Sequence, residues 1–208
     1  MKTVERAVVL LGMDLLSGLL LSMAAFDALP CTERCRFNLW NFQNHCFDCA
    51  MIAKELTIWH TDDKKQADNA FTAGLLHDVG RLVFCSYLPD QFDSALSLAK
   101  KQNRPLTLVE RDLFATDHAE IGFHLAKWWD LPDVLTQAIR YHHEPQKKSG
   151  PDQVILAAVH LADGLANQLP IGSGDSDFLQ IDKACWDLFN PTPRQMDQIH
   201  LLFGREQE

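Results

Sequence analysis

Apolar side chains recur at every third or fourth position through most of the chain, which is the period of helices that bury one face on a core. Near the start, Val4, Val8, Leu11 and Leu15 follow this period. Prolines fall close to the ends of such stretches, where proline is compatible with a helix terminus. The pattern predicts helices over Thr3–Ala28, Phe37–Trp59, Asp63–Leu76, Phe92–Lys101, Leu106–Phe114, Ala119–Trp129, Pro132–Tyr141, Val154–Asn167, Asp182–Phe189 and Arg194–Phe203.

The same pattern argues against strands and repeats. No run alternates between apolar and polar positions as a half-buried strand does, and no segment repeats with a period of about 20–50 residues. Polar residues mark two loops, Gln146–Asp152 and Pro170–Asp177. We predict an all-α fold in which residues 1–208 form a single domain, a multi-helix bundle with a C-terminal helical extension over residues 178–208.

The N-terminal stretch resembles a signal peptide only superficially. Lys2 and Arg6 precede apolar residues, but Glu5 lies among the basic residues and Asp14 interrupts the apolar run. The same Asp14, together with Asp27, is unfavourable in a membrane span. We therefore expect a cytoplasmic protein that does not enter a membrane.

A cytoplasmic location predicts that the cysteines are free thiols. The spacing Cys31-x3-Cys35 and Cys46-x2-Cys49 also permits a zinc site with four thiolates. Cys46 and Cys49 lie in a helix-like run, however, where cysteine is usually a small buried apolar residue. The sequence favours that second interpretation. Most of the six cysteines are therefore expected to be small core residues, and all six to be free thiols: Cys31, Cys35, Cys46, Cys49, Cys85 and Cys185.

Composition narrows the functional classes. The 208 residues are 47% hydrophobic and 23% charged, which is typical of a soluble globular protein. Nineteen Lys and Arg against 28 Asp and Glu give a net charge of −9, which argues against nucleic-acid binding through bulk charge. Nine histidines are the unusual feature, and they direct attention to metal or acid–base chemistry.

One motif places a histidine beside an aspartate at the end of an apolar helix. In the stretch Ala73–Arg81 the helix ends in His77-Asp78, and Gly80 is expected to turn the chain. The carboxylate could bridge two cations while the imidazole binds one of them. The alternative is that His77 only packs and Asp78 bonds to the following backbone amides.

Further candidate ligands occur at similar places. His142 and His143 end another predicted helix, His118 opens one, and His45 begins the run that contains Cys46 and Cys49. Asp163 lies in an apolar helix, where a buried carboxylate needs a metal or another partner. The alternative for Asp163 is a solvent-facing position.

These residues occur in one order along the chain: His45, His77-Asp78, His118, His142-His143 and Asp163. That order resembles the HD superfamily of metal-dependent phosphohydrolases, and more closely its regulatory branch, the HDOD (HD-related output domain) family. The resemblance covers residues 3 to about 168 and implies an orthogonal bundle of helices. It is carried by Thr3–Gly12, Phe71–Arg81, Glu110–Gly122, Trp129–Pro132 with His142-His143, and Val159–Asp163.

The chain departs from the family pattern in three ways. HDOD domains usually begin with helices that precede the position of Thr3, so the resemblance implies an N-terminally shortened form. The Gly-Tyr-Pro motif of the cyclic-di-GMP phosphodiesterase branch does not follow His143, where the sequence is Glu144–Gly150. HDOD proteins have commonly lost part of the metal-binding set, whereas this sequence keeps all of it.

The resemblance also implies two metal positions that share Asp78. His45, His77, Asp78 and Asp163 would hold one metal, and Asp78, His118, His142 and His143 the other. Mixed imidazole and carboxylate ligands suit divalent transition metals, and we expect Fe or Mn at one or both positions. Phe42 or Asn44 would replace His45 if the preceding loop differs in length. His60, His124, His160 and His200 are expected to be ordinary surface or core residues.

The expected catalytic residues are Asp78, which would bridge the metals, and Arg81, which could stabilise phosphate charge. The alternative for Arg81 is an ordinary surface position after a helix end.

Two functional hypotheses follow. The first is an HDOD-type signal-transduction domain that binds metal, with a regulatory protein partner or a phosphorylated small ligand. The second is a metal-dependent phosphohydrolase that acts on a nucleotide or cyclic nucleotide. No substrate-specifying motif is present, so the sequence favours the first hypothesis.

Overall fold

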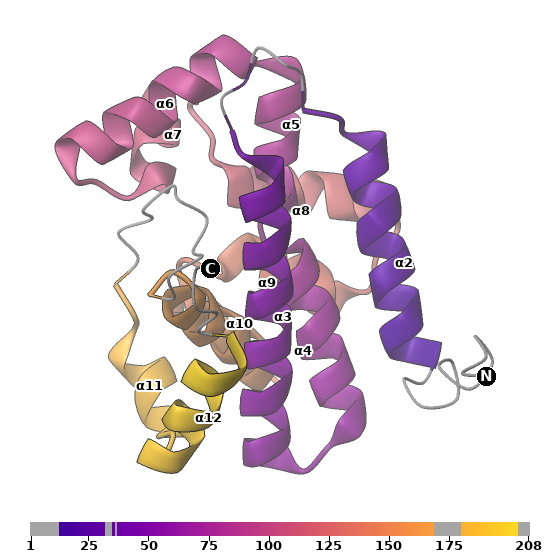
Figure 1. Cartoon of the computed structure of the whole chain (residues 1–208). Coiled ribbons are helices and arrows are strands. Elements are labelled where there is room, and N and C mark those ends of the chain that lie inside the picture. Colours follow the sequence, from indigo (N-terminus) through magenta and orange to yellow (C-terminus); the bar gives the residue numbers. More distant parts are fainter. Residues whose placement is uncertain (1–12, 32–34, 36, 169–179, 204–208) are drawn as a thin grey trace.

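The computed structural model describes residues 13–31, 35, 37–168 and 180–203, and the regular elements within these residues are all helical (Figure 1). The all-α prediction is confirmed. The described elements are α2 (Met13–Ala28), α3 (Leu39–Thr61), α4 (Lys64–Leu76), α5 (Val79–Tyr87), α6 (Pro89–Gln102), α7 (Leu106–Phe114), α8 (His118–Trp128), α9 (Asp133–Tyr141), the 3-10 turn η1 (Pro145–Lys147), α10 (Gln153–Ala166), α11 (Lys183–Phe189) and α12 (Pro193–Phe203).

Most of the predicted helices are found with ends shifted by a few residues. Parts of two predictions lie outside the described residues, namely the start of the first helix (residues 3–12) and the loop at residues 170–177. Several helix starts follow from local chemistry. The side chains of Asn38, Asp63, Asp117 and Asp182 accept hydrogen bonds from backbone N–H groups in the first turn of the helix that follows each of them.

The expectation that Gly80 turns the chain is wrong. A new helix, α5, begins at Val79 and contains Gly80 in its first turn. Gly80 is required for packing instead, because a Cβ atom at this position would collide with the carbonyl oxygen of His118 and lie 2.8 Å from the backbone nitrogen of Gly122. The glycine therefore allows α5 to approach the start of α8 at backbone distance.

The helices pack around a central pair. In Figure 1, α3 and α4 run side by side, with α2 along the outer side of α4, while α8 runs across them. The helix α10 packs on both α3 and α4, and α8 packs between α5 and α9. Two apolar clusters result, one on the side of α2, α5 and α6, and the other between α3, α10 and α12. The candidate ligands project from the helices that separate these clusters.

The cysteines only partly follow the prediction of free thiols. Cys31 and Cys85 form a disulfide that joins the segment after α2 to α5, with their Cα atoms 5.2 Å apart. The prediction is wrong for these two residues because helix packing brings them together across 54 positions of sequence. Cys46 and Cys49 are free and fully buried in α3, as small core residues. No described helix combines the length and the apolar character needed to span a bilayer.

Candidate metal centre

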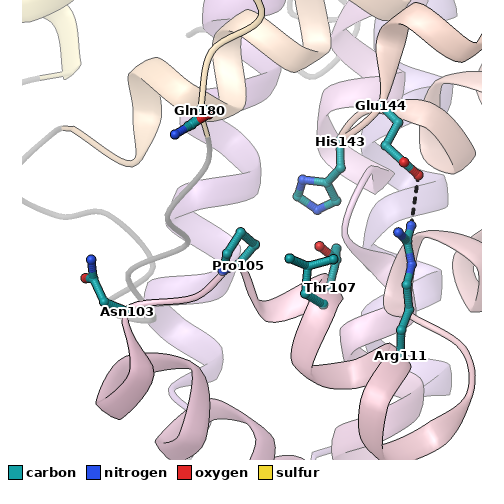
Figure 2. Close-up of a pocket in the computed structure, with 8 residues that line it drawn as sticks. Asn103, Pro105, Thr107, Arg111, His143, Glu144 and Gln180 are labelled. Atoms are coloured by element: carbon teal, nitrogen blue, oxygen red, sulfur yellow. Dashed lines mark hydrogen bonds and ion pairs between the residues drawn. The ribbon is translucent and has the colours of Figure 1, made fainter.

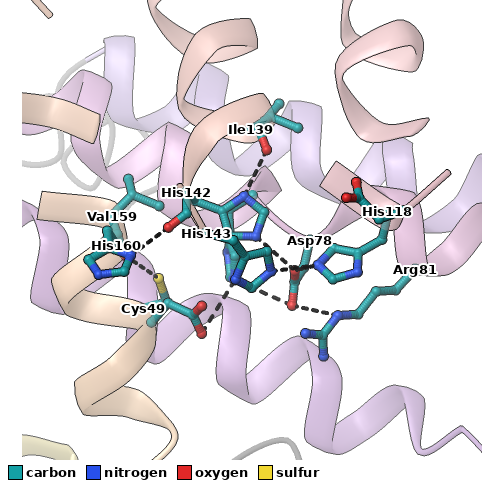
Figure 3. Close-up of polar contacts among 12 residues, drawn as sticks. Cys49, Asp78, Arg81, His118, Ile139, His142, His143, Val159 and His160 are labelled. Carbon is teal, nitrogen blue, oxygen red and sulfur yellow. Dashed lines mark hydrogen bonds and ion pairs between the residues drawn. The ribbon is translucent and has the colours of Figure 1, made fainter. Parts of the chain in front are cut away.

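Seven candidate ligands from five segments meet in the interior (Figure 3). Six of them are at most 1% exposed, and His143 is half-buried. They are His45 on α3, His77 at the end of α4, Asp78 before α5, His118 at the start of α8, His142 and His143 after α9, and Asp163 on α10.

Three of the ligands, His45, His77 and Asp163, form one group beside Asp78. His45 Nε2 lies 3.2 Å from Asp163 Oδ1 and 4.0 Å from Asp78 Oδ2. His77 Nε2 lies 3.3 Å from Asp78 Oδ2 and 3.9 Å from Asp163 Oδ1. Gly74 contributes to this geometry, since a Cβ there would lie 2.6 Å from the Cα of Ala50 on α3. The close contact of α3 and α4 brings the two imidazoles together.

The other oxygen of Asp78 faces the second group. Asp78 Oδ1 lies 3.2 Å from His118 Nε2 and 3.4 Å from His142 Nε2. His143 Nε2 in turn lies 2.8 Å from His118 Nε2. Asp78 therefore stands between the two groups with one carboxylate oxygen toward each, which is the arrangement that a bridging ligand requires.

Three of the imidazoles are held by hydrogen bonds through Nδ1. His77 Nδ1 donates to Gly74 O at 2.8 Å, and His142 Nδ1 donates to Ile139 O at 2.7 Å. Each acceptor is a carbonyl three residues earlier at a helix end, where intrahelical partners are missing. His118 Nδ1 instead pairs with Glu110 Oε2 at 2.7 Å. Such contacts leave Nε2 directed into the cluster, as is usual for metal-binding histidines.

The polar atoms that face one another in the centre fit a metal. Within the described part of the chain, His77 Nε2, His142 Nε2 and Asp163 Oδ2 lack a hydrogen bond of good geometry, and the oxygens of Asp78 meet their neighbours only in ion pairs. Burying such atoms without partners is unfavourable. Two ligands bound to one ion at about 2.0–2.2 Å stand roughly 3–4 Å apart. The separations around Asp78 and Asp163 have that size.

Burial and neighbouring carboxylates determine the charges of the metal-free site. Burial alone would lower the pKa of His118, but the Glu110 carboxylate raises it to about 10. Burial likewise opposes protonation of His77, yet Asp78 holds its pKa well above the usual value. Burial dominates at His142 and His143 and lowers both pKa values. The centre therefore combines protonated and neutral imidazoles when no metal is bound.

The two carboxyl groups are ionised in this environment. Burial would raise the pKa of Asp78, but Arg81, His77 and His118 hold it well below its usual range. The pKa of Asp163 is also lowered, since its hydrogen bond and charge contact with His45 outweigh burial. A metal ion entering the site would meet ionised carboxylates and would displace protons from His77 and His118.

Arg81 is buried rather than on the surface, so that alternative is wrong. Its side chain is 1% exposed, and Nε lies 3.0 Å from Asp78 Oδ2. The solvent-facing alternative for Asp163 is also wrong, because this residue is fully buried. His45 takes its predicted place in the cluster, while Phe42 packs in the apolar core. A contact of Arg81 with phosphate stays a prediction.

A cavity of about 610 Å³ reaches the centre at His143 (Figure 2). Thr107, Pro105 and Gln180 lie around the imidazole, and Arg111 lies beside it. The Arg111 guanidinium contacts Asp117 Oδ2 at 2.6 Å through Nε and Glu144 Oε2 at 2.9 Å through Nη2. It thus links the residue before His118 to the residue after His143, at the mouth of the site.

Two residues of the site were missed by sequence reasoning. Glu110 is fully buried and also accepts a hydrogen bond from the backbone N–H of His118 at 3.0 Å. Glu110 is followed by Arg111 and Asp112, so its place in a charged run gave no signal of a buried partner. His160, expected to be ordinary, is buried, and its Nδ1 lies 2.6 Å from the carbonyl oxygen of His142. No regular spacing in the sequence links Glu110 to His118 or His160 to His142, so neither contact could be predicted from it.

Comparison with protein families identifies a match to the HDOD domain over residues 1–145. The matched residues include six of the seven candidate ligands, and Asp163 lies beyond them. The match ends earlier than residue 168, the limit expected from the sequence.

Individual proteins are similar over most of this chain. An uncharacterized protein of Treponema pallidum is 27% identical over 187 residues, which are 89% of this chain and 35% of that protein. A Shewanella amazonensis structure, provisionally described as a phosphohydrolase, is 26% identical with a TM-score of 0.67, covering 100% of this chain and 69% of the other. A Marinobacter aquaeolei structure, provisionally described as a signal transduction protein, is 25% identical with a TM-score of 0.65, covering 93% and 45%. The chain thus spans about a third of the length of its curated relative.

Proposed function

This chain belongs to the HDOD domain family, and we propose that it is a regulatory signalling domain whose core binds one or two divalent transition-metal ions. The observation that carries the proposal is the convergence of seven imidazole and carboxylate side chains, six of them buried, in which facing atoms such as His77 Nε2, His142 Nε2 and Asp163 Oδ2 lack a hydrogen bond of good geometry among the described residues. The similarity to a protein described as acting in signal transduction supports the regulatory part.

The residues fit two adjoining metal positions. His45, His77 and Asp78 would hold one ion together with Asp163, whose Oδ1 lies 3.2 Å from His45 Nε2. Asp78, His118, His142 and His143 would hold the other. Mixed nitrogen and oxygen ligands favour a transition metal such as Fe or Mn over Mg or Ca. Six of the seven ligands are buried, which suits a resident ion. The absence of a substrate-specifying motif favours a metal that stabilises a signalling scaffold.

A metal-dependent phosphohydrolase is the second candidate function. The observation that favours it is the cavity at His143, which gives a phosphorylated small ligand such as a nucleotide a path to the second metal position. Metal ions at such a site would polarise a phosphoryl oxygen and lower the pKa of bound water. In this reaction Asp78 would be the ligand shared by both metal positions. The Arg81 guanidinium, with Nε 3.0 Å from Asp78 Oδ2, would compensate the negative charge of that carboxylate.

Metal analysis tests the proposal. Protein expressed in medium supplemented with iron and manganese should contain about 1–2 equivalents of transition metal, because the ligand set fits one or two ions. The variants His77→Ala and Asp78→Ala should lose most of it, since each removes a buried ligand. His124→Ala is the matched control, because His124 is 67% exposed and lies outside the cluster. Wild-type protein without bound metal would contradict the proposal.

A turnover assay separates the two candidate functions. Metal-loaded protein is incubated with a generic phosphodiester such as bis(p-nitrophenyl) phosphate. Bound metal without turnover supports the regulatory domain. Turnover that disappears in Asp78→Ala and persists in His124→Ala supports the phosphohydrolase.

A further inference from the structure

The C-terminal helices rest on the two helices that carry the first group of ligands. Ile199 of α12 is 1% exposed and belongs to the apolar cluster of α3 and α10. Trp186 and Phe189 of α11 pack against the same cluster. The ring of Phe189 also faces His60 on α3, with the ring centroids 5.4 Å apart. The pair α11–α12 is thus seated on α3 and α10, which hold His45 and Asp163.

A buried histidine links this pair to the second group of ligands. The backbone N–H of Asp182 donates to His160 Nε2 at 2.8 Å. Because Nε2 accepts this hydrogen bond, Nδ1 carries the proton of the neutral ring and donates to the carbonyl oxygen of His142 at 2.6 Å. His160 is 1% exposed, so water does not compete for either contact. Figure 3 shows the ring directed at the His142 carbonyl.

The two residues that His160 connects, Asp182 and His142, each lie at the end of a helix. Asp182 begins α11, because its Oδ1 accepts hydrogen bonds from the backbone N–H groups of Ala184 at 2.7 Å and Cys185 at 3.4 Å. His142 ends α9, where carbonyl groups lose their helical partners. The bond from His160 fixes this carbonyl at the turn that presents His142 and His143.

We propose that His160 is a positioning residue that couples occupancy of the metal centre to the seating of α11–α12. This inference rests on the proposed metal-binding function. Metal that holds His142 and His143 in place would hold the carbonyl to which His160 donates, and through His160 the backbone of Asp182. Because such coupling is reciprocal, a well-seated α11 would also strengthen metal binding.

The experiment compares His160→Phe with Asp182→Ala. The phenylalanine fills similar space but makes neither hydrogen bond, whereas Asp182→Ala removes the helix cap and keeps the N–H that donates to His160. Metal affinity is measured by competition with a chelator, and hydrogen exchange is followed at residues 182–189 with and without metal. We expect metal to slow exchange at α11 in wild-type protein and in Asp182→Ala. His160→Phe should lose that response, and its affinity for the metal should fall about tenfold.

A second pair of variants covers the case in which His160→Phe does not fold. Asp182 has a φ of −64°, which proline can adopt. Asp182→Pro removes the N–H as well as the cap and places the proline Cδ where the N–H pointed at His160 Nε2, so its difference from Asp182→Ala reports the loss of this contact with His160. The coupling should be lost in Asp182→Pro and retained in Asp182→Ala.

The outcomes distinguish the proposed metal-binding function from the coupling through His160. A wild-type protein that binds no metal overturns the proposed function and the coupling together. A metal-bound wild type whose α11 exchanges at the same rate with and without metal overturns the coupling alone. The same conclusion follows if the variants that lack the bond keep wild-type affinity and response.

Discussion

Gly80 lies where α5 meets the start of α8, and its missing side chain sets how closely the two backbones approach. The atoms that a Cβ would meet belong to backbone, which cannot rotate away. One of them is the carbonyl oxygen of His118, a candidate ligand. A single glycine thereby controls both the packing of α8 and the position of one imidazole.

We expect Gly80→Ala to lower the free energy of unfolding by at least about 2 kcal/mol, since overpacking of this kind outweighs the better helix propensity of alanine. It should also reduce the metal content, because α8 must move and His118 moves with it. Chemical denaturation and metal analysis measure the two effects.

Gly122→Ala is the matched control on the partner helix. A Cβ there would lie 2.9 Å from the Cγ2 of Ile139 and 3.3 Å from the backbone nitrogen of Gly80, which is milder crowding than at Gly80. The helix propensity gained by alanine is about 1 kcal/mol and should offset most of the crowding. Equal destabilisation by the two substitutions would contradict the role assigned to Gly80.

At this scale the sequence predicted the residue types that meet in the cluster, because His77-Asp78 and His142-His143 are informative even as dipeptides. It could not predict the partners that orient them. Glu110 pairs with His118, eight positions later, and His160 bonds to His142, 18 positions earlier. Neither separation is a fixed spacing, so only packing of the helices determines these contacts.

The helix ends show which local sequence signals were sufficient to predict a helix. Most helices were predicted because apolar periodicity and capping residues agree, as at Asp63 before α4. The helix α5 was missed for two reasons. Glycine at position 80 is a poor helix former, and α5 begins only a short break after the end of α4. The requirement for close packing on α8 is tertiary, and no local pattern expresses it.

The cap at Asp63 predicts a pH dependence for α4. Its side chain accepts hydrogen bonds from the side chain and backbone of Gln66 and from the backbone of Lys65, and these contacts lower the pKa of Asp63. A lowered folded-state pKa means that the stabilisation is present above the unfolded-state pKa, near 3.8, and is lost as the pH falls through the folded-state value.

We therefore expect Asp63→Ala to melt at a lower temperature than wild type at pH 6, and the difference to shrink as the pH falls below about 4. Thermal melts of both proteins across this range measure the difference. A gap in melting temperature that is constant from pH 6 to pH 2.5 would exclude an ionised cap.

The whole molecule is organised around a polar centre between two apolar clusters. That arrangement predicts that metal stabilises the entire fold rather than one helix, because the ligands come from α3, α4, α8, α9 and α10 or their ends. The sequence implied this set through its resemblance to a family. The cavity beside His143 and the Cys31–Cys85 disulfide could not be predicted, since both depend on how helices distant in sequence pack.

Removal of metal should lower the melting temperature of the whole protein. Free metal at about 100 times its dissociation constant adds roughly 2.7 kcal/mol for one site, which corresponds to about 5–10 °C in a domain of this size. Calorimetry with saturating metal and with chelator measures the change. Asp78→Asn should show almost no response, and a wild-type protein equally insensitive to chelator would contradict the expectation.

The spread of the ligands along the chain has a consequence for biosynthesis. His45 and Asp163 lie 3.2 Å apart in the folded protein, yet 118 positions of sequence separate them. At typical elongation rates a ribosome needs roughly 6–24 s to make that interval. During this time the nascent chain holds an incomplete set of ligands. A metal ion captured early would be exposed to exchange, and the identity of the bound metal would be decided only after α10 leaves the ribosome.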